Sequence, residues 1–535
     1  MKFGKSIVAG ASILALTIAP LQSLFTSAES SPPSNGDEAV QNVIFMIPDG
    51  YATSYSSNYR LYKEDGEPIW DDMLIGMMKT VSANNAITDS AAAGTAMATG
   101  EKTNNGMISM SPDGEELETI LEASKEAGKS AGLVATSTIT HATPAVFGSH
   151  TEARNDEHLI APQYLENEVD VIFGGGKNYF LPESEGGEQE ERHLINEFEE
   201  AGYQFVENKD ELEAIEEEKV LGLFAEGALA PELERDQTDE PSLAEMTESA
   251  IDVLDQNEEG FFLMVEGSQI DWAGHANDAA WAMSDTEAFE EAVTAAVEFA
   301  DQDGETLVVM AGDHDTGGMT VGGYDTGDTQ LEILHNVENT GGYIAGQLNS
   351  ERSNTRDIML ELANIEITND EEEAIRTSDA PDLEINHIIS NYAGVGWSSY
   401  DHTGQEVPLF AYGPESDLFT GLLDNTDIPK LMAEAMGISL GDAREPVESS
   451  IEQMQTQIDG FLAGGEITND ETARHLQTHL ISIEHYEEIG SMDKAIEHMN
   501  GFKALLKQLK ENELISENAY DYLHSSADDL IEQWG

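Results

Sequence analysis

The chain has 535 residues, no cysteine, and a formal charge of −81 from 105 acidic and 24 basic side chains. The lack of cysteine excludes disulfides, thiol catalysis and thiolate metal sites, and the charge argues against nucleic acid and anionic membranes as partners. So dense an acidic surface favours adaptation to salt, which screens the repulsion between like charges, although solubility alone is the simpler interpretation.

The first 28 residues have the organisation of a secretory signal peptide. Two lysines precede the apolar run SIVAGASILALTIAPLQSLF, and the small residues TSA follow it. The run is interrupted by glycine, serine and proline, which favours a cleaved leader over a membrane anchor. The sequence therefore predicts cleavage near Ala28, a linker over residues 29–40, and a secreted, extracellular protein without a transmembrane anchor.

From residue 41 to about residue 440, short apolar runs alternate with amphipathic stretches. Runs such as NVIFMI, GFFLMVEG and TLVVMAGDH are typical of strands buried on both faces, whereas LETILEASKEAGKS and MTESAIDVLDQ have helical spacing. This alternation predicts an α/β domain with a central, mostly parallel sheet flanked by helices. Residues 320–400 break the rhythm and are interpreted as an insertion over the carboxyl edge of the sheet.

The pattern changes again near Pro446, where four helical runs begin. Their helical spacing of apolar residues predicts a second, all-helical domain over residues 447–535. His475 and His479 lie four apart on one of these helices, but without a third ligand in view we favour a surface or packing role. The predicted apolar face comprises Leu476, Leu480, Ile483, Met499, Phe502, Leu505, Leu506, Leu523, Leu530 and Ile531.

Residues with metal-ligating side chains stand close to several of the predicted strands. Because ligands bind at the carboxyl ends of strands in open α/β sheets, these are candidate site residues. Each alone is more simply a cap or a satisfied buried group. Together, imidazoles and carboxylates suit a pair of borderline divalent ions, and without cations the carboxylates would repel one another. The residues are Asp49, Glu266, Asp271, His275, Asp313, His314 and His402.

The stretch AITDSAAAGTAMATG places Ser90 at the start of a predicted helix. Free backbone N–H groups and the helix dipole favour an anion there, so a phosphate on the hydroxyl would be stabilised. The simpler interpretation is an N-cap. No histidine stands beside Ser90 in the sequence, which disfavours a Ser-His-Asp triad and makes a metal the natural activator of the hydroxyl.

Six blocks in this order resemble the bacterial alkaline phosphatases over roughly residues 40–436: PDG, TDSAAAGTAMATG, HATPAVFGSHTEAR, MVEGSQIDWAGHAND, AGDHDTGG and DHTGQEVPLFAYGP. The resemblance implies an enzyme that hydrolyses phosphate monoesters through a phosphoserine, releases inorganic phosphate, and holds two zinc ions and one magnesium ion. It also implies roles for particular residues. Ser90 would be the nucleophile, Arg154 would grip the phosphate, Asp271, His275 and His402 would hold one zinc, Asp49, Asp313 and His314 the other, and Asp49, Thr143 and Glu266 the magnesium ion.

Two positions depart from better-known relatives, and two other functions stay open. His141 and Trp272 stand where such relatives often carry aspartate and lysine. An imidazole near the third site favours a more borderline ion, but magnesium is still the third metal that we predict. The alternatives are a phosphodiesterase of the same superfamily and a non-catalytic, acidic cation-binding surface protein. Arg154 and the TDS motif favour the monoesterase over the first, and the ordered ligands favour it over the second.

The final helical domain resembles the FIMAH domain found at the carboxyl end of some exported proteins of bacilli. The segments AGGEITNDETARHLQTHLISIEHYEE, KAIEHMNGFKALLKQ and LISENAYDYLHSSADDLIEQW carry the resemblance. It suggests attachment to the cell surface as one role of this domain. A homodimer is the assembly that we consider for the whole protein.

Overall fold

The structure is a computed structural model that describes residues 40–64, 66–323 and 329–441 and, with gaps, residues 451–534. The predicted signal peptide (1–28) and all but the last residue of the predicted linker (29–40) lie outside the described residues. The part up to residue 441 and the C-terminal helices are described separately below.

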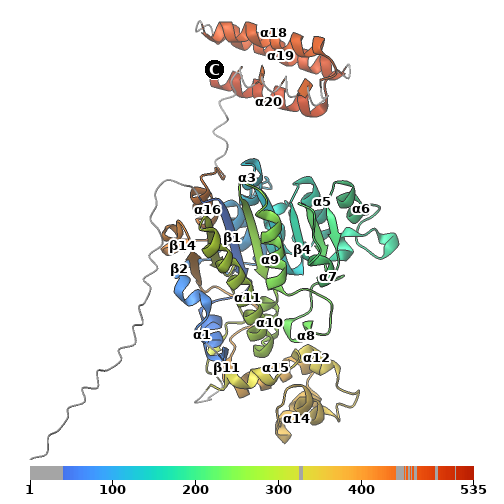
Figure 1. The fold of residues 1–535 in the computed structure, drawn as a ribbon, viewed down its shortest axis with the longest axis vertical. Helices are drawn as coiled ribbons and strands as arrows, with labels where there is room; N and C mark the ends of the chain where they lie inside the picture. Colours follow the sequence, from blue (N-terminus) through green and yellow to red (C-terminus); the bar gives the residue numbers. More distant parts are fainter. Residues whose placement is uncertain are drawn as a thin grey trace, which may run out of the picture. The chain divides into compact units, whose positions relative to one another are not determined.

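A ten-stranded sheet forms the centre of the larger part (Figure 1). Every strand pairing is parallel except those of β13 with β2 and β8, so β13 alone runs against the others. The predicted mostly parallel sheet is therefore confirmed. In sheet order the strands are β14 (Gly421–Asp424), β2 (Leu74–Lys79), β13 (Val407–Tyr412), β8 (Thr306–Ala311), β1 (Asn42–Pro48), β7 (Phe261–Gly267), β3 (Ser130–Thr138), β4 (Val171–Gly175), β6 (Val220–Leu223) and β5 (Gln204–Val206).

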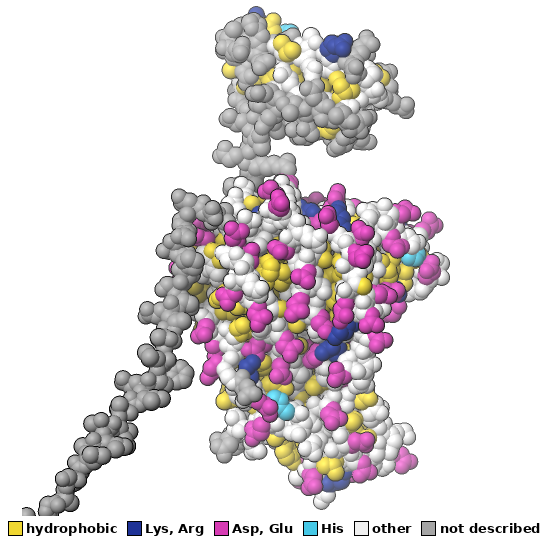
Figure 2. All heavy atoms as spheres, viewed as in Figure 1, with side chains coloured by type: hydrophobic (Ala, Val, Ile, Leu, Met, Phe, Trp, Pro, Cys, Tyr) yellow, Lys and Arg dark blue, Asp and Glu magenta, His cyan; other side chains and the backbone are white. Residues whose placement is uncertain are grey.

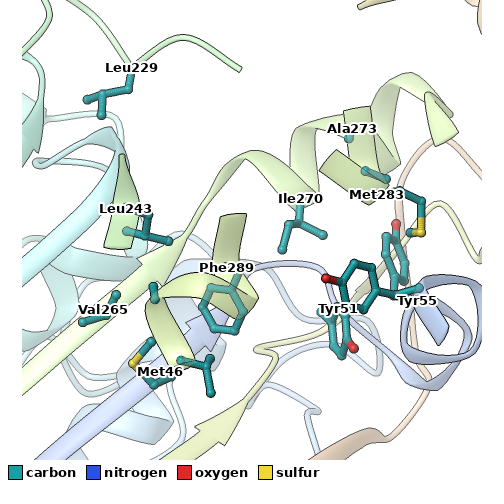
Figure 3. Close-up of a cluster of buried hydrophobic side chains, with 14 of the residues drawn as sticks. Met46, Tyr51, Tyr55, Leu229, Leu243, Val265, Ile270, Ala273, Met283 and Phe289 are labelled. Carbon is teal, nitrogen blue, oxygen red and sulfur yellow. The ribbon is translucent and has the colours of Figure 1, made fainter. Parts of the chain in front are cut away.

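Both faces of the sheet are covered by helices, which is why its central strands β1, β7 and β8 are mostly apolar and are buried along their whole length. In β1, Val43 and Phe45 belong to the core on one face and Ile44 and Met46 to the core on the other, as expected where successive side chains alternate. Figure 3 shows part of the Met46 core. That face carries α1 (Thr53–Tyr62), α9 (Leu243–Leu254), α10 (Gln269–Ala276) and α11 (Ala279–Asp303).

The opposite face is covered by a second set of helices, most of them short. They contribute apolar residues to the core that contains Val43 and Phe45. They are α2 (Ser90–Thr99), α3 (Ile120–Glu126), α4 (Ala142–Gly148), α5 (Glu157–Glu166), α6 (Leu194–Glu200) and α16 (Ile428–Met436).

Residues 320–400, predicted as an insertion, contain several helices. They lie beyond α1 and α10 in Figure 1, and their buried residues join the Met46 core. Two small antiparallel pairs, β9 (Asp315–Thr316) with β12 (His402–Thr403) and β10 (Thr320–Val321) with β11 (Val395–Gly396), connect the ends of this segment to the sheet edge. The helices are η4 (Leu331–Asn336), α12 (Gly341–Gly346), α13 (Thr355–Leu362), α14 (Asn369–Thr377) and α15 (Pro381–Ala393).

The C-terminal part contains the described helices α18 (Asp470–Glu488), α19 (Met492–Glu511) and α20 (Glu517–Trp534). They share a core of their own, and the predicted apolar positions all belong to it: Leu505 and Ile531 are partly buried and the others are buried. His475 is exposed on α18, as expected for a surface role. Among the residues that the structure describes, no helix has the length and apolarity needed to cross a bilayer.

Candidate active site

Ser90 is the first residue of α2, and the small side chains of this helix are explained by its capping and packing. Asp89 caps the helix, because its side chain accepts a hydrogen bond from the backbone N–H of Ala92 at 3.0 Å. A methyl group on Gly94 would come within 2.8 Å of Val146 on α4. The run SAAAGTAMATG thus lets α2 pack closely on α4 while its first turn faces the edge of the sheet.

The carboxyl ends of β1, β7 and β8 meet at this edge. Asp49 follows β1 and Glu266 is the penultimate residue of β7, while Asp271 and His275 lie one helical turn apart on one side of α10. Asp313 and His314 follow β8. Strand order therefore brings these six side chains together although they are up to 265 residues apart in the chain.

His402 reaches the same edge by a different route. It lies in β12 opposite Thr316 and just before β13. Because β13 is antiparallel to its neighbours, its beginning lies where the other strands end. A residue that precedes this strand can therefore join residues that follow the parallel ones.

Asp271, His275 and His402 form the first of two groups that could hold a cation. The Nε2 atoms of the two histidines are 3.2 Å apart, and each lies 3.5 Å from an oxygen of Asp271. Their Nδ1 atoms contact the backbone carbonyls of Tyr400 (2.6 Å) and Thr88 (2.9 Å). A carbonyl can only accept, so each Nδ1 carries a proton and the two Nε2 lone pairs face each other, as they would around a metal ion.

Asp49, Asp313 and His314 form the second group, and all three are buried. The Nε2 atom of His314 lies 3.1 Å from Asp313 Oδ2 and 3.6 Å from Asp49 Oδ1. Within the described part of the chain, neither of these carboxylate oxygens accepts a hydrogen bond. Buried oxygens without a donor are costly, and a cation at this position would satisfy both.

The shifted pKa values of residues in the two groups also favour cation binding at these positions. Burial, then the neighbouring Asp313 and Asp271, raise the pKa of Asp49 well above its usual value. Burial, then His314, lower the pKa of His402 to about 4, so this imidazole is neutral at physiological pH. Burial lowers the pKa of His314, but the neighbouring carboxylates, Asp313 first, outweigh it and raise this pKa. Crowded carboxylates and imidazoles form a donor set that fits zinc or a similar borderline ion.

No histidine stands beside Ser90 in the sequence, but the fold brings His314 into contact with Ser90. Ser90 Oγ lies 3.2 Å from Nε2 of His314. This is not the arrangement of a Ser-His-Asp triad, because Nδ1 of His314 contacts the hydroxyl of Thr316, at 3.2 Å, instead of a carboxylate. The same Nε2 faces two carboxylate oxygens of the second group, so Ser90 lies beside the candidate cation site itself.

Arg154 is held close to Ser90 by two neighbours. One guanidinium nitrogen donates to Asp89 Oδ2 at 3.1 Å and the other lies 3.1 Å from Nε2 of His141. Burial, then Arg154, lower the pKa of His141 to about 4, so His141 is neutral and its Nε2 accepts the hydrogen bond. Asp89 thus positions both the serine, as cap, and the arginine, as partner.

The three residues predicted to hold a third metal also lie together. Thr143 is buried in α4, and its hydroxyl donates to Asp49 Oδ2 at 3.3 Å. The carboxyl group of Glu266 interacts with both Asp49 and Thr143, and its Oε1 has no hydrogen-bond partner among the described residues. Burial raises the pKa of Glu266 to about 7. An oxygen-rich set of this kind fits magnesium.

All ten predicted site residues therefore lie at one edge of the sheet, and the structure adds others. The sequence interpretation missed the contact of Thr316 with both groups, the link from Asp89 to Arg154, and the two carbonyls that orient the histidines. Thr316 belongs to the AGDHDTGG motif, so its place near the site could have been inferred from the sequence. The residue types do not show which backbone carbonyls contact the histidines.

The structure shows two groups of candidate cation ligands at one edge of an α/β sheet, as expected of a metal-dependent enzyme, and the comparisons identify the family. Residues 40–438 match the alkaline phosphatase family and residues 451–532 match the FIMAH domain. Alkaline phosphatase 4 of Bacillus subtilis (strain 168) is 41% identical over 441 residues, which cover 78% of this chain and 94% of that protein. The cold-active alkaline phosphatase of a psychrophilic Shewanella is 33% identical, with a TM-score of 0.68 over 74% of this chain and 99% of that one.

A second similar structure contains magnesium. It is a variant of the alkaline phosphatase of the Antarctic bacterium TAB5, with a histidine replaced by aspartate and magnesium bound in its M3 site. It is 27% identical, with a TM-score of 0.57 over 75% of this chain and 99% of that one. The chain described here belongs to the alkaline phosphatase family and is a phosphoric monoester hydrolase.

Proposed function

We propose that the chain hydrolyses phosphate monoesters through a phosphoserine on Ser90, with two zinc ions and one magnesium ion, as a secreted enzyme adapted to salt. One observation carries the proposal: Ser90 Oγ lies at the beginning of α2 and 3.2 Å from Nε2 of His314, which belongs to a buried group of candidate cation ligands. The hydroxyl is thus next to both a helix N-terminus and a candidate metal site.

The two groups of ligands would hold the zinc ions. Asp271, His275 and His402 would bind one, and Asp49, Asp313 and His314 the other. When bound, the ions would supply Lewis acidity, which lowers the pKa of a hydroxyl or a water molecule and neutralises charge on the phosphate.

The other residues would act on the phosphate directly. Arg154 has a planar pair of donors suited to two nonbridging oxygens, and its contacts with Asp89 and His141 hold it on the side of Ser90. The N–H groups of the first turn of α2 would favour the anion. Attack by Ser90 Oγ would form the serine–phosphorus bond and release the alcohol, and water would then release inorganic phosphate.

Magnesium is the third metal that we propose, held by Asp49, Thr143 and Glu266. The oxygen donors of this group support it. In the TAB5 variant, magnesium occupies the M3 site after a histidine is replaced by aspartate. His141 in this chain is engaged with Arg154, and replacing it by aspartate should likewise favour magnesium.

Several wider features belong to the same proposal. The predicted signal peptide supports secretion, the charge of −81 supports adaptation to salt, and the match to the FIMAH domain supports a catalytic domain over residues 41–440 followed by a helical domain over 447–535. Surface attachment through the helical domain and assembly as a homodimer complete the proposal.

A direct test uses the purified chain with a chromogenic phosphate monoester and the matching diester, before and after chelation. We expect kcat/KM for the monoester to be at least about 100-fold higher than kcat/KM for the diester. Chelation should abolish turnover, and added zinc and magnesium should restore it. Faster diester hydrolysis, or turnover that survives complete metal removal, would overturn the proposal.

A further inference from the structure

One buried hydroxyl connects the two candidate zinc groups. Thr316 is completely buried, and its Oγ1 lies 3.2 Å from Nδ1 of His314 and donates to Oδ1 of Asp271. His314 belongs to the second group and Asp271 to the first. The side chain therefore contacts one proposed ligand of each metal.

The chemistry of these contacts determines where the protons lie. A hydroxyl has one proton and two lone pairs, and an ionised carboxylate can only accept. The Thr316 proton therefore lies toward Asp271, and the hydroxyl oxygen accepts from Nδ1–H of His314. With the Nδ1 proton fixed in this way, the neutral imidazole has its lone pair on Nε2, the atom that faces the carboxylates of Asp49 and Asp313, and this is the form that binds a cation.

The surroundings leave Thr316 little freedom to move. Its N–H donates to the carbonyl of Gly50 at 3.0 Å, and its carbonyl accepts from the hydroxyl of Tyr55 at 2.6 Å. Tyr55 is itself a core residue, shown with Ala273 and Met283 in Figure 3. The threonine backbone is thus anchored to α1 and to the residue that follows Asp49.

Glycines on two sides make room for the side chain. A Cβ at Gly50 would lie 2.8 Å from Thr316 Oγ1 and 2.9 Å from the Cα of Asp271, and a Cβ at Gly274 would lie 2.9 Å from Thr316 Cγ2. These separations are shorter than ordinary contacts between non-bonded atoms. The site therefore fits a threonine closely, and its hydroxyl is held in one orientation.

We propose that Thr316 is a positioning residue that fixes His314 and Asp271 relative to each other and so strengthens zinc binding in both groups. This rests on the proposed function, since the two groups must be zinc sites. An ordinary buried threonine would satisfy its hydroxyl on a backbone carbonyl, as Thr247 does on Leu243 at 2.7 Å. Thr316 instead uses its proton and one lone pair on proposed ligand side chains.

Three variants of the full chain test the proposal. Thr316→Val keeps the shape and removes the hydroxyl, while Thr316→Ser keeps the hydroxyl. Thr403→Val is the matched control, because Thr403 lies in the paired strand β12 and its hydroxyl donates to Asp315, which belongs to neither group. The metal-free proteins are titrated with zinc against a chelating dye in excess magnesium, and bound zinc is counted by elemental analysis.

We expect wild type to bind two zinc ions and Thr316→Val to bind both about 10- to 100-fold more weakly, the usual effect of losing a partner of a metal ligand. Thr316→Ser and Thr403→Val should stay within about threefold of wild type by the same reasoning. The thermal midpoint of the metal-free chain should be similar in all of them, since a folding defect would lower it. If Thr316→Val does not fold, Thr316→Ala carries the same expectation.

Three results would overturn the inference. Unchanged zinc affinity in the folded valine or alanine variant, or loss at only one of the two sites, would show that Thr316 does not link the groups. A serine variant as weak as the valine variant would assign the effect to shape. Wild-type chain that binds no zinc would instead overturn the proposed function, and the role of Thr316 with it.

Discussion

Ser90 has two independent structural neighbours that suit a nucleophile, the first turn of α2 and the buried Asp49–Asp313–His314 group. The contact with His314 at 3.2 Å is a single weak one, so the serine adds little to the binding of a cation. We therefore expect Ser90→Ala to lower kcat by at least about 1,000-fold, as loss of a nucleophile does, while zinc content stays at the wild-type value. Steady-state kinetics and elemental analysis of the same preparation check both. Substantial turnover by a metal-replete variant would exclude the phosphoserine.

Arg154 should distinguish between substrates. The two guanidinium nitrogens of Arg154 can bind two terminal oxygens of a monoester. A diester carries less negative charge, so the same contact with a diester is weaker. Arg154→Ala should therefore lower kcat/KM for a monoester about 100-fold and weaken inhibition by inorganic phosphate, because a charged bidentate contact contributes about 1.5–3 kcal/mol.

Arg154→Lys is the control for charge, because it keeps the cation and loses the planar pair of donors. Most of the loss should remain in this variant. Equal losses on monoester and diester in both variants would assign Arg154 to folding and not to the grip on phosphate.

Glu266 should make the stability of the metal-free chain depend on pH. Its pKa is raised by burial to about 7 from an ordinary value of 4.5, so between these values the folded chain binds a proton that the unfolded chain has lost. The free energy of unfolding therefore falls as pH rises through this window. His402 acts in the opposite direction over much of the same range, because its pKa is lowered to about 4.

The comparison with Glu266→Gln isolates the effect of Glu266, since His402 is present in both proteins. With metals removed, the thermal midpoint of wild type minus that of the variant should decrease between pH 5 and pH 7. Thermal melts at several pH values measure this difference. A difference that stays constant or increases over the window would mean that Glu266 is already ionised without metal.

At the scale of elements, the sequence predicted strands far better than it predicted contacts. Runs such as NVIFMIP are buried along their whole length in β1, and an apolar run of that kind has few alternatives in a parallel sheet. The helices within residues 320–400 were not predicted individually. In α14, NDEEEAIRT buries only Ile375, so its pattern has almost no apolar periodicity to detect.

For the candidate site too, the sequence predicted the residues but not the contacts between them. Residue types at strand ends indicated the ligands, but the reversed direction of β13, which brings His402 to the edge, depends on strand order. The proximity of Ser90 to His314 likewise joins residues 224 positions apart. Such contacts follow from tertiary packing, and no local pattern in a single sequence contains them.

The two parts of the chain should be separable in function. Every proposed ligand lies before residue 403, and the helices α18 to α20 have a core of their own. A chain that ends at Ala443 should therefore hydrolyse monoesters with kcat/KM within about threefold of the full chain, because an independent domain carries its own core. Kinetics of the two purified chains, each with metals saturating, make the comparison.

The same truncation that carries Ser90→Ala provides the background rate. Loss of activity in a soluble, metal-replete truncated chain would show that the helical domain supports the site. Retained activity would leave attachment as the role to test for that domain, by comparing how much of each chain stays with the cells that express it.

At the scale of the whole molecule, acidic side chains dominate the surface. Figure 2 shows them spread over the visible face of the larger part, with few lysines and arginines between them. Some of those cations are already paired, as Lys125 is with Asp170 at 2.6 Å and Lys219 with Glu168 at 2.8 Å. With 24 basic side chains for 105 acidic ones, carboxylates far outnumber the cations that could pair with them, and the compact state concentrates the repulsion between carboxylates more than the unfolded chain does.

Salt should relieve that repulsion, since the Debye length falls from roughly 10 Å at 0.1 M to roughly 3 Å at 1 M. We expect the thermal midpoint to rise from low to molar sodium chloride. Sodium chloride is the appropriate salt because sulfate also strengthens apolar burial by exclusion from the surface. The apparent KM for a phosphate monoester should fall over the same range, because screening also weakens the repulsion between the anionic substrate and the acidic surface. Melts and kinetics with metals saturating measure both, and a midpoint that stays flat up to molar sodium chloride would assign the acidic surface to solubility alone.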